Sequence, residues 1–216
     1  MPRTLLLDLD GTLVDTVPDL AAALNRLMAD RGLPAFSHPQ VAAMVGDGIV
    51  ALVSKAFAAH HRQPDPADLD QFAADYAAHA AIDSKLFPNV LPVLSGLAAD
   101  GWQLAVCSNK PERAARALLD AVGLLPLLCA VGGGDSFAAR KPDPAHLLAT
   151  LARAGASPAT ALMLGDHRND VIAARDAGLR SIFALWGYAA PGMEAGATAV
   201  ARDIGEAAAI ARRLLP

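Results

Sequence analysis

Short runs of apolar residues recur along the chain, with longer stretches of helix-forming composition between most of them. Apolar runs of this length that end in polar or glycine-rich segments are typical of buried strands. The helical stretches start at a proline or a polar residue and stop just before a glycine, which are the usual boundaries of a helix. The predicted strands are Thr4–Leu9, Gln103–Cys107, Leu128–Val131, Ala161–Leu164 and Ser181–Leu185, and the predicted helices between them are Pro111–Val122, Pro144–Ala154 and Asn169–Ala177.

This alternation predicts an α/β fold, in which a doubly wound parallel sheet is covered by helices on both faces. In such sheets, ligands bind at the carboxyl ends of the strands. Polar residues that directly follow a predicted strand are therefore the first candidates for a functional site.

One segment breaks the alternation, because residues 15–85 contain no strand-like run. Thr16 and Asp19 match the spacing of a capping box at its beginning. The segment follows the first strand and would lie over its carboxyl end. We therefore expect a helical cap domain at 15–85, inserted into a core domain formed by 1–14 and 86–216. The helices predicted in the cap are Pro18–Arg31, His38–Val45, Ile49–His61 and Ala67–Ala81.

The composition argues against several classes of protein. Hydrophobic residues make up 54% of the 216 residues, which is enough to bury a sizeable core and argues against disorder. The net charge is −4 and no cluster of Lys and Arg forms a basic stripe, so we expect no nucleic-acid partner. The uncharged stretch 122–134 is broken by Pro126 and is shorter than the roughly 20 residues of a membrane helix, so we expect no membrane partner.

The N-terminal run and the cysteines bear on the compartment. Asp8 and Asp10 interrupt the first apolar run before it could form the core of a signal peptide. Cys107 and Cys129 show neither metal-binding spacing nor a disulfide framework, as expected in a reduced cytoplasm. We expect both cysteines to be small buried side chains. The sequence thus predicts a soluble, cytoplasmic protein.

The first predicted strand ends in two carboxylates and a glycine. Residues two apart in a strand point to the same side, so Asp8 and Asp10 leave the strand end together. Two like charges so close favour either a shared proton or a bound cation, and a hard cation with oxygen ligands is the usual solution. Gly11 allows the backbone to turn sharply beside that cation. The strand end is therefore the predicted reaction centre.

Three further polar groups follow predicted strands. Ser108 and Asn109 stand before a helix, where they suit phosphate oxygens or a simple helix cap. Lys141 precedes two prolines that fix the backbone, which suits a rigid charge clamp as well as a surface lysine beside a turn. Asp166 and Asp170, four residues apart at the entry of a helix, can reach one cation, or one of them can cap the helix.

The order of these groups is an Asp pair, a Ser, a Lys and a second Asp pair, each at a predicted strand end. In order and spacing they resemble the four motifs of the haloacid dehalogenase superfamily, most of whose members are magnesium-dependent phosphatases. The resemblance covers about residues 5–187 and leaves only the C-terminal helix less characteristic. It is closer still to the phosphoglycolate phosphatases and their near relatives, which have segments similar to Leu7–Thr16, Pro18–Leu20, Val45–Gly48, Ser108–Lys110, Gly133–Ser136 and Lys141–Pro144.

The resemblance implies a Rossmann-like core, a helical cap and hydrolysis of a small phosphorylated metabolite. Asp8 would be the nucleophile that forms an aspartyl-phosphate, and Asp10 would protonate the leaving oxygen and then activate water. Lys141 would offset the charge of the phosphoryl oxygens and orient Asp8. The implied substrate contacts are Thr12, Ser108, Asn109, Lys141 and, in the cap, Gly46 and Gly48. Mg²⁺ would be held by the Asp8 carboxylate, the Asp10 main-chain carbonyl and Asp166, with Asp170 acting through water.

Two positions depart from the pattern of these relatives. His167 stands where they often carry Ser or Thr, and because magnesium prefers oxygen we expect this imidazole behind the ligands rather than among them. Asn89 stands where they often carry Gly, and asparagine tolerates a left-handed backbone. The remaining histidines show no metal-binding spacing and are expected to be caps or surface residues: His38, His60, His61, His79 and His146.

The motifs make 2-phosphoglycolate the first candidate substrate and leave alternatives open. A phosphatase for a sugar or amino-sugar phosphate, or a sugar-phosphate mutase, would use the same core. Lys55 and Arg62 are cap cations that would suit such a substrate, although each is more typical of a solvated helix residue. The alternative outside the enzymes is a catalytically silent binding protein. The sequence is compatible with a monomer or a homodimer.

Overall fold

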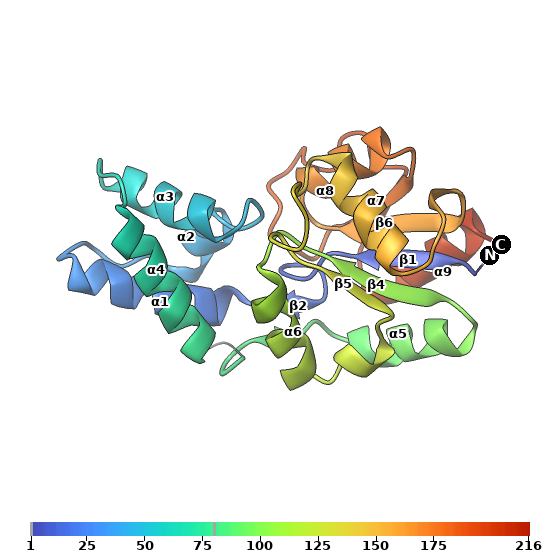
Figure 1. Ribbon diagram of the computed structural model, residues 1–216, viewed down its shortest axis with the longest axis horizontal. Helices are drawn as coiled ribbons and strands as arrows, with labels where there is room; N and C mark the ends of the chain where they lie inside the picture. Colours follow the sequence, from blue (N-terminus) through green and yellow to red (C-terminus); the bar gives the residue numbers. More distant parts are fainter. Residues whose placement is uncertain (1, 80) are drawn as a thin grey trace.

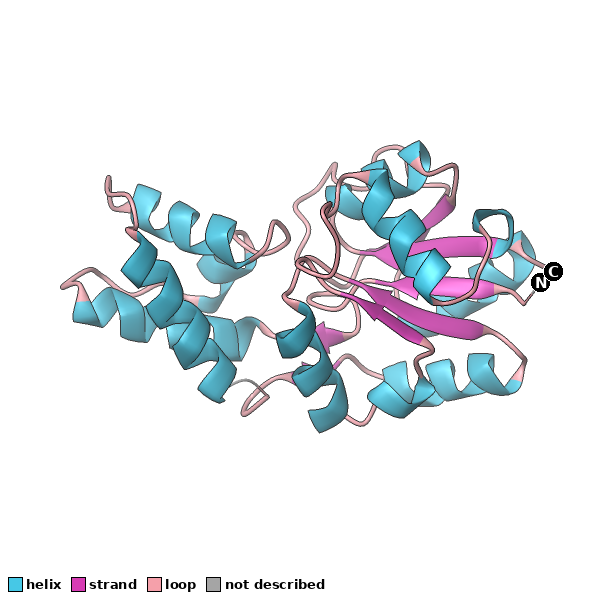
Figure 2. Ribbon diagram, in the orientation of Figure 1, coloured by secondary structure: helices cyan, strands magenta, loops and turns pink. Residues whose placement is uncertain are grey.

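The computed structural model describes residues 2–79 and 81–216, and its main feature there is a six-stranded parallel sheet (Figure 2). The strand order is β5-β4-β1-β6-β7-β8, and every neighbouring pair is parallel. This is the α/β fold that the sequence predicts. The strands are β1 (Thr4–Leu7), β4 (Gln103–Cys107), β5 (Ala130–Gly132), β6 (Ala161–Gly165), β7 (Arg180–Ala184) and β8 (Ala199–Ala201).

Helices cover both faces of the sheet (Figure 1). Successive residues of a strand point to opposite sides, so a strand that is apolar at every position needs a helix layer on each face. In β1, Leu5 and Leu7 share one hydrophobic cluster, whereas Leu6 belongs to another. The first cluster includes residues of α5 (Val90–Ala99), α6 (Glu112–Ala121) and α9 (Ile204–Leu214), and the second includes residues of α7 (Pro144–Arg153) and α8 (Arg168–Asp176).

The four helices within residues 17–79 form a separate helical unit, which Figure 1 shows beside the carboxyl-end edge of the sheet. Their apolar faces pack into a hydrophobic cluster of their own that contains the buried aromatic residues Phe57, Phe72 and Tyr76. The helices are α1 (Val17–Asp30), α2 (His38–Ala42), α3 (Ile49–Ala59) and α4 (Pro66–His79), each within two residues of its predicted start. The prediction extended the last helix to Ala81, and residue 80 lies outside the described residues.

Two chain crossings join the helical unit to the sheet, and they pair with each other. Strand β2 (Val14–Asp15) is antiparallel to β3 (Lys85–Leu86), a pair that the sequence analysis did not predict. Just beyond β3, Asn89 has φ 64°, so it adopts the left-handed backbone expected for this position. The crossings therefore lie side by side next to the end of β1.

Two local expectations were wrong. Thr16 has a helical backbone, and its hydroxyl makes no capping hydrogen bond. Asp19 does not reach back to Thr16 and instead accepts from the backbone N–H groups of Asp83 and Ser84, each at 2.9 Å. Cys129 is exposed rather than buried, and its thiol donates to the carbonyl of Leu104. Helix α5, strand β8 and two short 3₁₀ helices at Leu125–Leu127 and Pro158–Thr160 were not predicted from the sequence.

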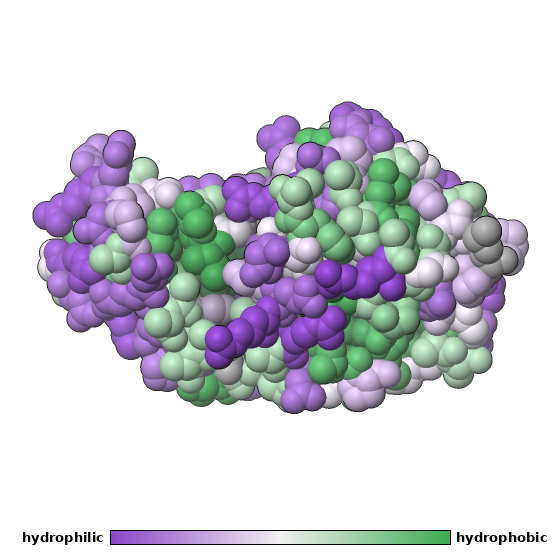
Figure 3. Space-filling model, in the orientation of Figure 1, coloured by the Kyte–Doolittle hydropathy of each residue, from purple (hydrophilic) through white to green (hydrophobic). Residues whose placement is uncertain are grey.

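Polar and apolar residues are interspersed on the face drawn in Figure 3, and a hollow separates the helical unit from the sheet at its upper edge. Within the described residues, no helix is both long enough and apolar enough to cross a bilayer.

Candidate active site

The predicted site residues meet at the carboxyl ends of the strands. Asp8 follows β1, Ser108 follows β4 and Asp166 follows β6, and these three strands are direct neighbours in the sheet. Because the strands are parallel and in register, the side chains that follow them reach the same edge. Lys141, in the loop after β5, reaches the same place from the edge of the sheet.

Lys141 binds two of the predicted acids at once. Its ammonium donates to Oδ1 of Asp8 at 2.8 Å and to Oδ1 of Asp170 at 2.6 Å, and all three residues are buried. Burial alone would lower the pKa of Lys141, but the adjacent carboxylates raise it well above its ordinary value. The lysine is therefore a permanent positive charge at the base of the site.

Asp8, Asp166 and Asp170 each offer one carboxylate oxygen, and the three oxygens lie within 4.8 Å of one another. Burial and the neighbouring carboxylates raise the pKa values of Asp8 and Asp166, although Lys141 opposes the shift at Asp8. One lysine cannot balance the negative charge of three buried carboxylates. Because all the offered ligand atoms are oxygens, the cluster suits a hard divalent cation. The arrangement fits the cation that the sequence predicts.

Further groups hold Asp166 in place. Thr12, fully buried, donates its hydroxyl to Oδ1 of Asp166 at 3.0 Å, so this hydroxyl supports an acid of the cluster rather than facing a cavity. The backbone N–H of Tyr188 donates to Oδ2 at 2.8 Å. A side chain at Gly11 or Gly187 would collide with the Asp166 carboxylate, so only glycine lets the backbone approach it there.

Asp10 is bound by Lys110, which belongs to the Ser108–Lys110 motif and has no role predicted from the sequence. The Lys110 ammonium donates to the two carboxylate oxygens of Asp10 at 3.0 and 3.3 Å. It also donates to the hydroxyl of Tyr76 in α4, at 2.7 Å, and lies 4.5 Å from the centre of that ring. Burial alone would lower the pKa of Lys110, but the charge of Asp10 raises it.

Ser108 and Asn109 directly precede Lys110 in the chain. Both are buried, and the Asn109 amide donates to the carbonyls of Gly46 at 3.0 Å and Lys141 at 2.9 Å. Its Oδ1 is buried with no hydrogen-bond partner among the described residues. Asn109 thus ties the helical unit to the loop that carries Lys141.

The Gly46–Gly48 loop of the helical unit packs directly on the sheet edge. Gly46 has φ 119° and Gly48 has φ 87°, which favour glycine, and a Cβ at Gly46 would lie 2.5 Å from the His167 ring. Asp47 accepts from Asn169 at 2.8 Å and pairs with Lys55 at 2.7 Å. The loop is therefore fixed against the helix that carries Asp170.

A cavity of about 40 Å³ lies between this loop and the strand ends. Since one water needs roughly 10–15 Å³ by this measure, the space suits a compact ligand. A wider cleft of about 400 Å³ lies on the other side of Gly46, next to Asp166 and His167. The residues that line the smaller cavity are Asp8, Asp10, Leu20, Val45, Gly46, Gly48, Ile49, Leu52, Ser108, Asn109 and Lys110.

Comparison with known proteins identifies the family. The model of the haloacid dehalogenase-like hydrolases matches residues 2–178. The phosphoglycolate phosphatase of Rhodospirillum rubrum is 42% identical over 212 residues, which cover 94% of this chain and 88% of that protein. The protein of the same name from Caulobacter vibrioides is 43% identical over 189 residues, covering 86% and 80%. The chain belongs to the haloacid dehalogenase-like hydrolase family.

Structural similarity agrees with this assignment. The crystal structure of a predicted phosphoglycolate phosphatase from Haemophilus somnus superposes with a TM-score of 0.87 at 29% identity, covering 96% of this chain and 97% of that one. Together these relatives identify the chain as a phosphoric monoester hydrolase of the haloacid dehalogenase-like family, similar to phosphoglycolate phosphatases.

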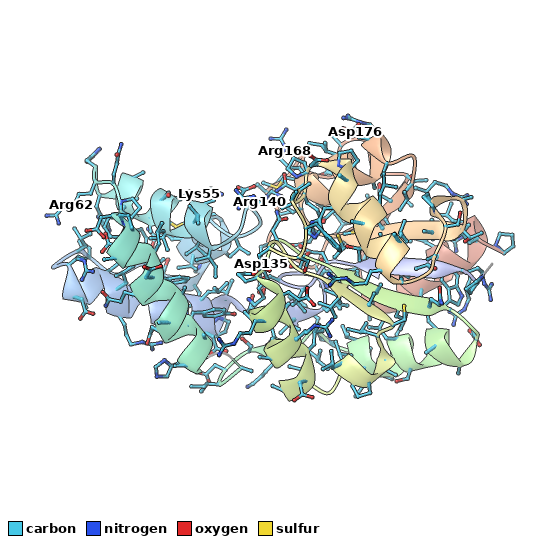
Figure 4. The ribbon with its side chains drawn as sticks, in the orientation of Figure 1. Lys55, Arg62, Asp135, Arg140, Arg168 and Asp176 are labelled. Carbon is cyan, nitrogen blue, oxygen red and sulfur yellow. The ribbon has the colours of Figure 1, made fainter. Side chains whose placement is uncertain are left out.

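Other residues weighed in the sequence lie outside the carboxylate cluster of this hydrolase. Lys55 is paired with Asp47, and Arg62 is exposed at the outer end of the helical unit (Figure 4). His167 caps α8, and its Nδ1 accepts from the backbone N–H of Asn169 at 3.3 Å.

His146 corrects the expectation that the remaining histidines are caps or surface residues. It is fully buried, and its Nδ1 accepts from the backbone N–H of Lys141 at 3.2 Å. Burial lowers the pKa of His146 to about 4, so the ring is neutral near pH 7. This hydrogen bond supports the loop that carries Lys141, and the spacing of the two residues in the sequence gave no signal of the contact.

Proposed function

We propose that this chain is a Mg²⁺-dependent phosphatase that hydrolyses a small phosphate monoester, with 2-phosphoglycolate as the first candidate, through an aspartyl-phosphate intermediate. The observation that carries the proposal is the position of Lys141, between Asp8 and Asp170 and beside Asp166. An anionic nucleophile and an anionic substrate repel each other, and this arrangement gathers the positive charge needed to bring them together.

The proposed metal ligands are the Asp8 carboxylate, the Asp10 main-chain carbonyl and Asp166, with Asp170 acting through water. The hydrogen bonds from Thr12 and from the Tyr188 backbone would orient Asp166 for this role. When bound, Mg²⁺ neutralises charge on the nucleophile and on the phosphoryl oxygens. In this proposal Thr12 positions a ligand, and the substrate contact expected from the resemblance remains a prediction.

In the first step, a carboxylate oxygen of Asp8 attacks phosphorus and forms the acyl-phosphate bond. Asp10, which is paired with Lys110 in the structure, must take up a proton before this step. The bond between phosphorus and the ester oxygen then breaks, and Asp10 gives that proton to the ester oxygen as the alcohol leaves. Lys141 holds Asp8 in place and offsets the charge of the phosphoryl oxygens. The Ser108 hydroxyl and the Asn109 side chain, which line the cavity, are proposed to bind those oxygens.

In the second step, water attacks phosphorus and Asp10 takes up its proton. The bond between phosphorus and Asp8 breaks, inorganic phosphate is released, and both aspartates return to their starting states. Asp10 is suited to both roles because it lies at the cavity, partly exposed, with its orientation fixed by Lys110.

We propose that residues 15–85 form a cap domain on a core of 1–14 and 86–216. Two observations support this division: the helical unit has its own hydrophobic cluster, and the chain crosses to it only next to the paired strands β2 and β3. Opening at this crossing would admit substrate, and closure would exclude water before the first step.

The small cavity and the names of the relatives support a compact substrate. Several of the matched proteins bear the name phosphoglycolate phosphatase, and the cavity that Asp8 and Asp10 line together, of about 40 Å³, suits a small ester. The site residues of this chain would position such an ester with its phosphoryl group toward Asp8 and its alcohol toward Asp10.

Phosphate release with Mg²⁺ would test the proposal on a panel of 2-phosphoglycolate, hexose and amino-sugar phosphates, and nucleotides. We expect kcat/KM for 2-phosphoglycolate to exceed the others by at least roughly tenfold, which corresponds to about 1.4 kcal/mol of transition-state binding. A higher value for a sugar phosphate would overturn the substrate assignment and leave the chemistry in place.

Asp8→Asn serves as the matched control for the chemistry, since it removes the nucleophile while retaining the shape of the side chain. This variant should release no phosphate above background. Turnover that depends on metal in Asp8→Asn would contradict the proposed nucleophile, and a wild-type protein inactive on every ester would favour a silent binding protein.

A further inference from the structure

Lys110 has a place in the cavity that its pairing with Asp10 does not fully explain. Among the described residues that line the cavity, it is the only lysine or arginine. It is buried, with 5% of its surface exposed, and therefore cannot serve as a general surface charge. A positive charge held inside a ligand cavity indicates recognition of a negative group.

Lys110 makes three hydrogen bonds with described side chains, and one of them is long. Its ammonium lies 3.0 and 3.3 Å from the two carboxylate oxygens of Asp10 and 2.7 Å from the Tyr76 hydroxyl. Because an ammonium has three donors, the donor that makes the 3.3 Å contact can turn to an anion in the cavity that Lys110 lines while the shorter contact with Asp10 is kept. Tyr76 also packs its ring on the ammonium, which holds the charge in one position.

We propose that Lys110 binds a carboxylate carried by the leaving alcohol, so that the site selects phosphate monoesters with a carboxylate one carbon beyond the ester oxygen. This inference rests on the proposed function, because Asp10 must contact the ester oxygen in order to protonate it. A hydrogen bond of roughly 3 Å from Asp10 to that oxygen places Lys110 within about 6 Å of it. A carboxylate on the adjacent carbon spans this gap.

The opposite wall of the cavity supports selection against sugars. The helical unit contributes Leu20, Val45, Ile49 and Leu52 to it, all of them apolar side chains. Hydroxyl groups of a sugar would lose their water against such a wall and find no replacement partners there. Lys55, the other cation near this loop, is already paired with Asp47 and does not line the cavity.

The decisive comparison uses 2-phosphoglycolate and 2-hydroxyethyl phosphate, which differ only in having a carboxylate or a hydroxymethyl group at the end of the alcohol. In Lys110→Met, the ratio of their kcat/KM values should fall at least roughly thirtyfold from its wild-type value, since hydrogen bonds to charged groups are worth about that factor. The ratio is the critical readout, because loss of Asp10 positioning alone would slow both substrates equally.

Tyr76→Phe is the matched control. It removes the hydroxyl that contacts Lys110 but keeps the ammonium and the aromatic ring, so the ratio should stay within roughly threefold of wild type while both rates change together. An unchanged ratio in Lys110→Met would show that Lys110 acts only through Asp10, and this would overturn the inference.

Inhibition of the wild-type protein supplies a second test that needs no variant. Glycolate should compete with substrate, whereas ethylene glycol at the same concentration should not; equal effects of the two would also overturn the inference. If the wild type hydrolyses other esters but not 2-phosphoglycolate, the proposed substrate and this inference fall together. If it prefers 2-phosphoglycolate and the ratio survives in Lys110→Met, only the inference falls.

Discussion

The ammonium of Lys141 lies 2.8 Å from Oδ1 of Asp8, although 133 positions separate the two residues in the chain. The contact is buried, and the same ammonium reaches Asp170. A charge pair in this setting cannot lose one partner without leaving the other buried and uncompensated. The stability of the protein and its proposed chemistry therefore depend on the same lysine.

Replacing this lysine should affect activity and stability together. In Lys141→Met we expect kcat to fall by at least roughly a hundredfold, because a fixed charge beside the reacting phosphoryl group is lost. The free energy of unfolding should fall by about 3 kcal/mol, since two carboxylates remain buried without their partner. Urea denaturation and steady-state kinetics measure both. The exposed Lys85→Met is the control and should change neither appreciably; wild-type kcat in Lys141→Met would contradict the proposed clamp.

The hydroxyl of Thr12 should matter for the metal rather than for the substrate. Thr12→Val keeps the shape and removes the 3.0 Å hydrogen bond to Asp166. We expect the Mg²⁺ concentration for half-maximal activity to rise by roughly tenfold or more, with KM for substrate at saturating Mg²⁺ nearly unchanged. Thr4→Val, at the opposite end of β1, is the control. If KM rises while the Mg²⁺ requirement does not, Thr12 contacts the substrate instead.

Variants at Gly46 and Gly32 should separate the effect of backbone strain from the effect of losing the contact between the helical unit and the sheet. Gly46→Ala forces a side chain onto the His167 ring at φ 119°, which would push the helical unit away from the sheet. Gly32→Ala, also at positive φ but with open space around it, suffers only the backbone penalty of about 1 kcal/mol. Both variants should lose stability in urea, and only Gly46→Ala should lose kcat/KM, by roughly tenfold or more. Equal kinetics for the two variants would contradict the role of this contact.

Buried His146 predicts a pH dependence of stability. Its pKa is lowered to about 4 from the ordinary 6.5, so between these values the unfolded chain binds more protons than the folded one. Stability must then decrease as pH falls through this window, with no penalty well above pH 6.5 and about 2 kcal/mol at pH 5. His146→Gln should lack this component, and the exposed His38→Gln should retain it. Urea unfolding at two pH values measures this difference. If the free energy of unfolding changes with pH equally in wild type and His146→Gln, the assigned role of His146 is wrong.

The sequence predicted the parts of the fold whose signals are local. Buried strands appear as apolar runs, and because parallel strands end at one edge, the sequence alone was enough to predict that Asp8, Ser108 and Asp166 lie at the same edge of the sheet. Helix α5 was missed because Val90–Ala99 is apolar almost all round and includes Pro92, which hides helical periodicity. Strands β2 and β3, with two residues each, are too short to show alternation.

The missing parts of the site are contacts between distant segments. Tyr76 reaches Lys110 from the helical unit, and Tyr188 reaches Asp166 through a backbone N–H that carries no sequence signature. Thr12 was expected at the substrate, yet its hydroxyl faces Asp166, because the side-chain direction after the β1 turn depends on packing that composition does not reveal. Lys110 belongs to the Ser108–Lys110 motif. Because Asp10 is an acid that needs a positively charged partner, a lysine at this strand end could have been predicted to pair with it.

The most direct test of the central claim is to trap the phosphoenzyme. Wild-type protein mixed with Mg²⁺ and 2-phosphoglycolate, quenched in acid within the first turnover and digested, should yield the peptide containing Asp8 with the mass of one added phosphoryl group, and Asp8→Asn treated in the same way should yield none. A phosphoryl group on another residue, or turnover with no phosphorylated peptide at any quench time, would contradict Asp8 as the nucleophile.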